Sequence, residues 1–141
     1  MKILKMFMCR HDGTSAVEFA ILAPLFILLI MGMIAFGIYF GAMHSVQQIA
    51  ADAARTAIAG LNETERQTLA QRFIDVNAGH YVFIDSSRLD VEVSDNPDDP
   101  QQFIVAIQYD ARDLPIWRLL TSLPLPGTTI SRSSTIRIGG I

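Results

Sequence analysis

The sequence has a single cysteine and few histidines, and this scarcity excludes several kinds of site. Cys9 is the only cysteine in the 141 residues, so the chain can form no internal disulfide and no zinc site built on several thiolates. The three histidines, His11, His44 and His80, stand far apart, without the spacing of a metal-binding pair. We therefore expect no metal centre.

A strong excess of charge is also missing. The net charge is −3, from 11 basic and 14 acidic residues, and lysine or arginine forms no run. This composition disfavours nucleic acid as a partner. The sequence has no glycine-rich phosphate loop and no Ser-His-Asp order, so we expect a protein that is not an enzyme and has no cofactor.

One long stretch contains no charged residue at all. Thirteen of the 25 residues from 19 to 43 are Leu, Ile or Phe. A helix of this length is roughly 37 Å long, against about 30 Å for the hydrocarbon core of a membrane. Because a domain this small cannot bury so many apolar side chains, we expect a transmembrane helix.

The charges that flank this stretch predict its orientation. Basic residues gather on its N-terminal side: Lys2, Lys5, Arg10 and His11. By the positive-inside rule, the N-terminus is cytoplasmic and residues 44–141 are exported. A cleaved secretory signal is the competing interpretation, but such signals have an apolar region of about 7–15 residues. Here the apolar run is longer, and a helical pattern continues beyond it.

The segment just before the apolar stretch admits two interpretations. Ser15 and Glu18 fit a capping box, in which the serine caps the helix and the glutamate reaches back to the serine amide. Gly13 would then be a flexible joint, and Glu18 would also be favoured by the helix dipole. The other interpretation is functional, and local physics alone does not separate the two.

The layout of this segment resembles that of type IV prepilins. A short basic leader ends in a glycine, a glutamate follows five residues later, and a long apolar helix comes next. Residues 13–25, Gly-Thr-Ser-Ala-Val-Glu-Phe-Ala-Ile-Leu-Ala-Pro-Leu, resemble the TadE/TadG family of pilin-like proteins of tight-adherence (Tad) systems. The likeness continues through Phe36-Gly37, the alanine-rich stretch 48–59 and Leu-Pro-Leu-Pro-Gly at 123–127, whereas residues 62–100 carry no family motif.

The resemblance implies that an inner-membrane prepilin peptidase cuts between Gly13 and Thr14. Glu18 then becomes the fifth residue of the mature chain and, with Phe19, serves peptidase recognition and assembly. Its carboxylate can pair with the N-terminal amine of a neighbouring subunit. Thr14 stands where better-known type IV pilins and secretion pseudopilins have phenylalanine, which favours a Tad-type protein and leaves N-methylation of Thr14 open.

The resemblance further implies a minor pilin (pseudopilin) of a Tad/Flp-type pilus assembly and secretion machine, acting in filament initiation or assembly. Its implied partners are the prepilin peptidase, other Tad pilin-like subunits, the Flp major pilin and the Tad inner-membrane platform proteins. It would cross the bacterial inner membrane once and expose a periplasmic or extracellular domain. The alternative is an unprocessed, membrane-anchored adaptor or sensor ectodomain that binds another envelope protein.

The long helix carries three further features. Pro24 removes a helical hydrogen bond and predicts a kink. Gly37, Gly41 and Ser45 form a row of small residues, which lets two membrane helices approach closely, although glycine is also common in spans. Beyond the membrane, apolar residues recur at three- and four-residue steps as far as Leu61. They predict an amphipathic helix whose alanine-rich face packs on the chain's own sheet or on a neighbouring subunit.

The remaining residues predict an α+β domain. Asn62 and Glu65 mark the start of a second helix, ended by Gly79, with three side chains facing inward: Leu69, Phe73 and Val76. Alternating residues around 89–93, 103–109 and 130–138 predict strands, so we expect a small antiparallel sheet of three or four strands packed on the helices. The expected division is a cytoplasmic leader 1–13, a transmembrane and amphipathic helix 14–61, and an exported domain 62–141.

The polar loop between the first two strands contains the carboxylates of Asp95, Asp98 and Asp99. Ca²⁺ favours such oxygen ligands, but the loop lacks regular alternate spacing and a closing glutamate. A solvated turn is therefore the favoured interpretation.

Overall fold

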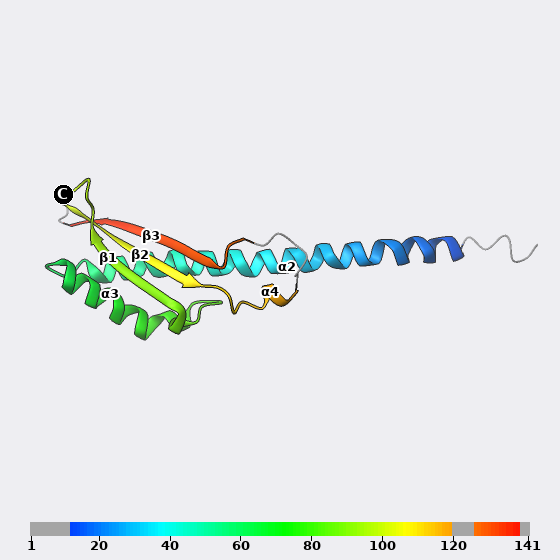
Figure 1. Cartoon of the computed structure of the whole chain (residues 1–141), viewed down its shortest axis with the longest axis horizontal. Helices are drawn as coiled ribbons and strands as arrows, with labels where there is room; N and C mark the ends of the chain where they lie inside the picture. Colours follow the sequence, from blue (N-terminus) through cyan, green and yellow to red (C-terminus); the bar gives the residue numbers. More distant parts are fainter. Residues whose placement is uncertain (1–11, 120–125, 139–141) are drawn as a thin grey trace, which may run out of the picture.

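The fold combines one very long helix with a small domain of helices and strands. The computed structural model describes residues 12–119 and 126–138. Its helices are α2 (Asp12–Ala57), α3 (Glu63–Asn77) and the short α4 (Ile116–Leu119); its strands are β1 (Leu89–Asp95), β2 (Gln102–Asp110) and β3 (Thr129–Arg137); and two 3₁₀ turns, η1 (Ala78–His80) and η2 (Ser86–Arg88), lie between α3 and β1. This arrangement confirms the predicted α+β class, with three antiparallel strands in the described ranges (Figure 1).

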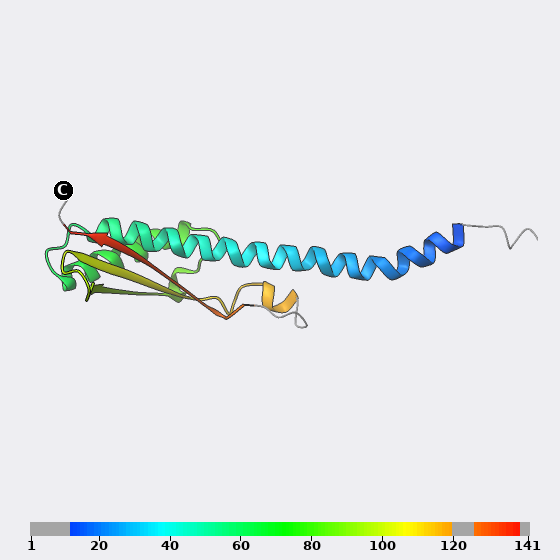
Figure 2. The same ribbon diagram turned by 90° about the horizontal axis from the view of Figure 1, so that it is seen from above.

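Helix α2 is a rod of 46 residues that both projects from the domain and forms part of it. Its N-terminal half stands free, and its C-terminal half lies along the sheet (Figure 1). Pro24 lies inside the helix, and Figure 2 shows the helix bending near its blue N-terminal end, as a missing backbone hydrogen bond predicts. Because α2 already begins at Asp12, Ser15 is not its N-cap, and the capping-box interpretation is wrong.

The C-terminal half of α2 packs on the chain's own sheet and on α3. Its buried face consists largely of small side chains: Ala42, Val46, Ile49, Ala50, Ala53, Ala54 and Ala57. Alanine lets the backbones of neighbouring elements come close, which helps α2 to contact four of them: α3, β2, β3 and α4. Ile58 and Leu61 were expected on this face but are 49% and 86% exposed, because the helix ends at Ala57.

Helix α3 begins where the sequence predicts. The Asn62 side-chain oxygen accepts a hydrogen bond from the Glu65 amide at 2.9 Å, and the Glu65 carboxylate accepts one from the Leu61 amide at 2.8 Å. The predicted inward stripe is confirmed only in part, because Phe73 is partly buried and packs against the core, whereas the fully buried positions are different ones. The buried residues of α3 are Arg66, Ala70 and Ile74, whereas Val76 is 65% exposed. The last residue of α3 is Asn77, two residues before the end predicted at Gly79, and Gly79 itself lies inside η1.

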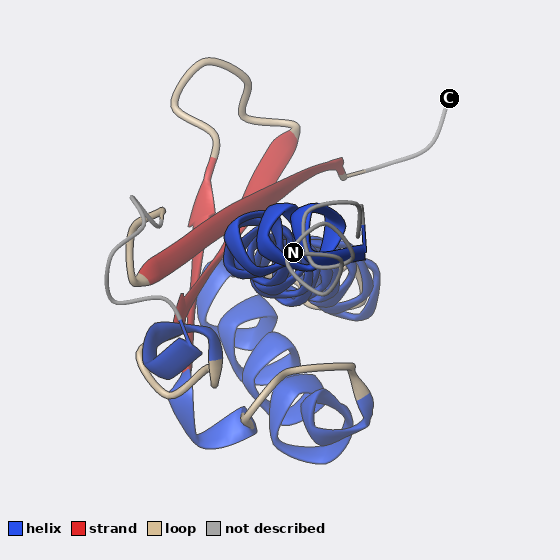
Figure 3. Cartoon of the chain, turned by 90° about the vertical axis from the view of Figure 1, so that its right-hand side faces the viewer, coloured by secondary structure: helices blue, strands red, loops and turns tan. Residues whose placement is uncertain are grey.

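The sheet has the order β1-β2-β3, with both pairs antiparallel. Val93 lies opposite Val105, which in turn lies opposite Ser134. As predicted, the alternate residues of β2 point into the core: Phe103, Val105, Ile107 and Tyr109. Both long helices lie on one side of the sheet (Figure 3), so the opposite face carries mostly polar side chains, such as Glu92 and Ser133, together with Ile104 and Ala106 of β2.

Two glutamines from the helices occupy the outer edges of the sheet. The Gln67 amide group donates to the Val91 carbonyl oxygen at 2.8 Å and accepts from the Val93 amide at 2.7 Å. On the other edge, Gln47 donates to the Ser133 carbonyl oxygen at 3.3 Å. Since free backbone groups on an edge strand invite pairing with another chain, these contacts disfavour assembly by strand addition at these positions.

Candidate functional site

The predicted processing and assembly residues lie at the free end of α2. Gly13 and Thr14 are in the first turn of the helix, and Glu18 and Phe19 follow on its exposed surface. No basic side chain of residues 12–119 and 126–138 forms an ion pair with Glu18. Residues 1–11, most of the predicted leader, lie outside the described residues.

Large apolar side chains surround the projecting part of α2. Apart from Met31, which is partly buried, those from Val17 to Ile34 are exposed by 40% to 73%. A helix that is apolar on all sides needs an apolar environment, either a protein core or lipid. Here the domain does not supply that environment, and the helix is long and apolar enough to cross a membrane. The structure therefore fits a single-pass membrane protein.

The row of small residues meets a loop of the same chain over part of its length. A Cβ atom on Gly41 would lie 3.0 Å from two atoms of the Phe83 ring, whereas one on Gly37 would meet nothing within 4 Å. The buried hydroxyl of Ser45 donates to the Val82 carbonyl oxygen at 2.9 Å. Two members of the row thus have a neighbour within the chain, and the packing of this row against another helix remains a prediction.

Phe83 is held over Gly41 by an unusual backbone conformation. Its φ is 62°, a left-handed value that is uncommon for a bulky residue. The Tyr109 hydroxyl donates to the Phe83 carbonyl oxygen at 3.1 Å and accepts from the Asp85 amide at 3.4 Å. Burial raises the pKa of Tyr109 above its ordinary value, so the hydroxyl keeps the proton that this contact uses. The loop is therefore fixed to both α2 and β2.

This arrangement predicts opposite effects for two neighbouring glycines. Gly41→Ala should destabilise the domain by about 1 kcal/mol, because the added methyl group would lie 3.0 Å from the Phe83 ring, which must shift to make room. Gly37→Ala should be neutral or stabilising by up to about 1 kcal/mol, because alanine favours helix and nothing opposes it. Denaturant unfolding of the full chain in detergent micelles measures both variants. Equal losses from the two substitutions would contradict the contact with Phe83.

Two carboxylates at the polar loop after β1 pair with arginines of the same chain. The Asp95 carboxylate pairs with Arg66 at 2.7 Å, and Asp99 pairs with Arg137 at 3.2 Å. A hydrogen bond from the Gln101 amide is the main cause that lowers the pKa of Asp99, followed by the contact with Arg137. Among the described residues, no group of three His, Cys, Asp or Glu side chains is placed to hold a metal ion.

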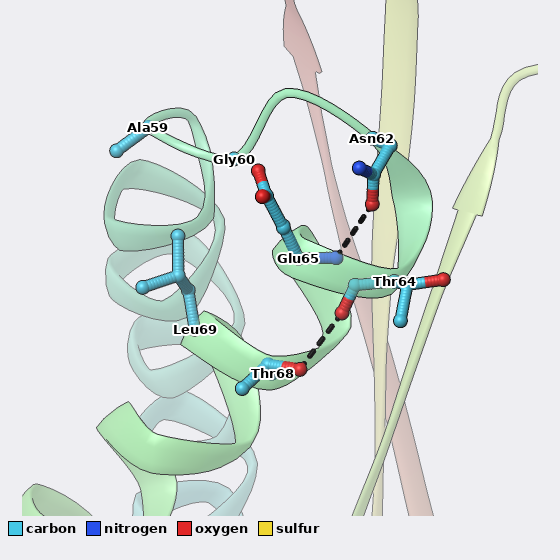
Figure 4. Close-up of a pocket in the computed structure, with 7 residues that line it drawn as sticks. All are labelled: Ala59, Gly60, Asn62, Thr64, Glu65, Thr68 and Leu69. Atoms are coloured by element: carbon cyan, nitrogen blue, oxygen red, sulfur yellow. Dashed lines mark hydrogen bonds between the residues drawn. The ribbon is translucent and has the colours of Figure 1, made fainter.

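An apolar depression lies at the far end of the domain, between the end of α2 and the start of α3 (Figure 4). It is lined by Ala59, Gly60, Asn62, Thr64, Glu65, Thr68 and Leu69. Two hydrogen bonds in it, from the Glu65 amide to Asn62 and from the Thr68 hydroxyl to the Thr64 carbonyl oxygen, belong to the helix itself. The lining contains no nucleophile paired with a base, so it provides no catalytic arrangement.

Comparison with known families identifies the long helix. A family model described as TadE-like protein matches residues 13–55. Residues 13–55 are a TadE-like domain. The match confirms the resemblance predicted from the sequence for this segment. No curated protein and no solved structure matches the chain.

The TadE-like domain coincides with α2. It begins at Gly13, the predicted cleavage residue, and ends two residues before the helix does. It therefore contains Glu18, Phe19 and the whole row from Gly37 to Ser45. Helix α3 and the sheet follow it, outside the match. The likeness expected at 123–127 also lies outside the match, and residues 120–125 are not among those described.

The sequence did not predict which residues outside the TadE-like domain contact it. Phe83 and Tyr109 hold a loop against α2, yet no local pattern marks either of them for that role. A phenylalanine at positive φ has no sequence signature, because glycine and asparagine are the usual residues there. Tyr109 was expected in the core from strand alternation alone, and its hydroxyl contacts were not foreseen.

Proposed function

We propose that this chain is a pilin-like minor subunit of a Tad/Flp-type pilus assembly and secretion machine. The observation that carries the proposal is the coincidence of the TadE-like match with a projecting apolar helix. Within that helix Glu18 is followed by no acidic residue until Asp52. Such a helix suits a subunit that waits in the membrane and then packs with other helices in a filament.

We propose further that a prepilin peptidase hydrolyses the bond between Gly13 and Thr14. Both residues lie in the first helical turn. A peptidase needs an extended backbone at the bond it cuts, and glycine lowers the cost of leaving the helix. Terminal turns of helices also open readily, which supports cleavage at this place.

Cleavage would create a positive charge close to Glu18. The new amine on Thr14 would lie four residues before Glu18, one turn of the helix away. The exposed carboxylate of Glu18 could neutralise this amine or the amine of a neighbouring subunit. Pairing between subunits would set their axial position in a filament, because each charged end has only one partner at membrane depth.

We also propose a membrane orientation for the chain, a set of partners and a division into segments. The basic residues before the helix support an N-terminus in the cytoplasm and a domain on the far side of the bacterial inner membrane. The proposed partners are the prepilin peptidase, other Tad pilin-like subunits, the Flp major pilin and the platform proteins. The proposed division is a leader at 1–13, the membrane and amphipathic helix at 14–61, and the exported domain at 62–141.

Mass spectrometry of the N-terminus tests the processing step. The full chain is expressed in bacterial membranes with and without the prepilin peptidase. With the peptidase, we expect a product that begins at Thr14. Gly13→Val should lower the processed fraction by at least about tenfold, since a branched side chain both clashes in a narrow protease cleft and restricts the backbone.

Ser15→Ala is the matched control and should be processed like the unchanged chain, because it alters a neighbouring residue without touching the cut bond. Glu18→Gln, which removes the charge and keeps the size, should reduce the incorporation of the chain into sheared filaments. An intact N-terminus in the presence of active peptidase, together with normal function of Gly13→Val, would refute the proposal and favour the unprocessed adaptor.

A further inference from the structure

The membrane-proximal end of the domain begins within reach of the lipid bilayer. Ala35 is fully buried, and Met31 already packs against the same core cluster. Ala35 lies 17 residues after Glu18, a distance that a helix covers in about 25 Å. The hydrocarbon core of a membrane is about 30 Å thick. If the Glu18 carboxylate stays at the cytoplasmic surface, the part of the domain that covers Ala35 reaches the opposite leaflet.

Helix α4 is the part of the domain that lies nearest the projecting half of α2. Both Figure 1 and Figure 2 show it beside the middle of α2, closer to the projecting half than α3 or the sheet. The Tyr39 hydroxyl donates to the Gly127 carbonyl oxygen at 3.2 Å and ties the chain after α4 to the same stretch of α2. Ile116 is fully buried in the core that includes Ala35 and Tyr39.

The outward side of α4 has the chemistry of a membrane interface. Trp117 is half-buried, and its indole N–H donates to the Ala111 carbonyl oxygen at 2.6 Å, so the exposed part of the ring is hydrocarbon. Arg118 is exposed, and no acidic side chain of the described ranges pairs with it. Tryptophan gathers at the level of lipid headgroups, and arginine can extend its charge toward their phosphates.

We propose that α4 is an interfacial foot, formed by Ile116–Leu119, that rests in the headgroup layer of the membrane crossed by α2. Trp117 contacts the upper part of the acyl chains, and Arg118 contacts the phosphates of anionic lipids. The proposal rests on α2 spanning the membrane but does not require cleavage at Gly13. We infer that lipid rather than protein contacts α4, because the short free length of α2 brings α4 to the depth of the leaflet.

The protein reports on this contact itself, because Trp117 is its only tryptophan. The full chain is reconstituted into vesicles of phosphatidylcholine with phosphatidylglycerol, and insertion is checked by flotation and resistance to alkaline extraction. Lipids brominated near the glycerol end or near the methyl end of the acyl chains then quench the fluorescence. We expect the strongest quenching from bromine near the glycerol end, and little quenching by aqueous iodide.

Arg118→Glu should lose most of the bromolipid quenching in anionic vesicles and less of it in phosphatidylcholine alone. Arg72→Glu makes the same charge change on the exposed surface of α3 and should leave quenching unchanged. Circular dichroism verifies that both variants stay folded. The proposal is overturned if iodide quenches Trp117 while bromolipids do not, or if the two variants behave alike.

Shielding from both quenchers would also overturn the proposal, because it would mean that protein rather than lipid covers Trp117. Failure of the chain to insert would overturn the membrane span itself, and it is seen in the flotation step before any quenching is measured. Failure of the peptidase to cut leaves the quenching result intact, so the two proposals can be judged separately.

Discussion

Phe103→Ala should lower the free energy of unfolding of the domain by about 3–5 kcal/mol, the usual cost of emptying a buried aromatic site. Phe103 is fully buried in the middle strand, opposite Asp95 on one side and Ile136 on the other. The Arg66 guanidinium lies 5.0 Å from the centre of its ring. The substitution would leave a cavity and would also remove the aromatic face that this buried cation contacts.

Ile104→Ala is the matched control for this prediction. Ile104 is the next residue of β2 and points to the opposite, partly exposed face of the sheet. Its truncation should cost about 1 kcal/mol or less, because little packing is lost there. Both variants are unfolded with denaturant in detergent micelles, with circular dichroism as the readout. Comparable losses for the two would show that Phe103 is not at the centre of the core.

Gly60→Ala should destabilise the domain by about 3 kcal/mol, through steric overlap and the loss of a buried charge contact. A Cβ atom on Gly60 would lie 2.7 Å from the Arg66 backbone nitrogen and 2.8 Å from its Cγ. The Arg66 amide belongs to the first turn of α3, where it donates to the Asn62 carbonyl oxygen at 3.0 Å. This backbone cannot yield without moving the helix.

Moving the first turn of α3 would also disturb the charge of Arg66. Its side chain is 7% exposed and pairs with Asp95 at 2.7 Å, and its Nε atom donates to the Gly60 carbonyl oxygen at 3.3 Å. A buried cation that loses its partner costs more than the pair contributes when intact. The substitution therefore adds an electrostatic cost to the steric one.

Gly79→Ala is the control, because a Cβ atom there would meet nothing within 4 Å. Its effect on stability should stay within about 0.5 kcal/mol. Unfolding curves in detergent for the two glycine variants decide the matter. A Gly60→Ala protein as stable as the Gly79→Ala protein would mean that α3 does not pack closely on the end of α2.

The strands were predictable because their signal is local. In β2, alternate side chains from Phe103 to Tyr109 are apolar, and the pleat of a strand sends them all to one face. Antiparallel pairing of β1 with β2 then follows from the polar loop between them, which has hairpin length. No contact with a distant element is needed for either inference.

The inward stripe of α3 could not be predicted in the same way. A count of apolar residues selects Val76 and passes over Arg66, since arginine is rarely buried. Arg66 is buried because its charge meets Asp95, 29 residues away, and its guanidinium lies against Phe103. The pattern within the helix contains neither partner. The predicted stripe therefore included Phe73, which packs against the core, but missed Arg66 and placed the exposed Val76 inside.

The candidate functional site, like the fold, was predictable only where its signal lies in adjacent residues. The order of Gly13, Glu18 and the apolar run was visible in adjacent residues, and the family match at 13–55 confirmed the family that it suggested. The neighbour of Gly41 was not visible, because Phe83 reaches it only through a left-handed backbone held by Tyr109. A row of small residues shows that another segment can pack closely against the helix, but it does not identify that segment.

The sequence by itself determined that the chain has an apolar rod with an acid near its start, and a domain of alternating strands behind it. Both properties come from the spacing of neighbouring residues, and spacing is what sets the faces of helices and strands. Only the tertiary structure decided that the domain covers the rod from Ala35 onward and brings α4 to that level. Those positions depend on contacts between residues far apart in the chain, which no local period encodes.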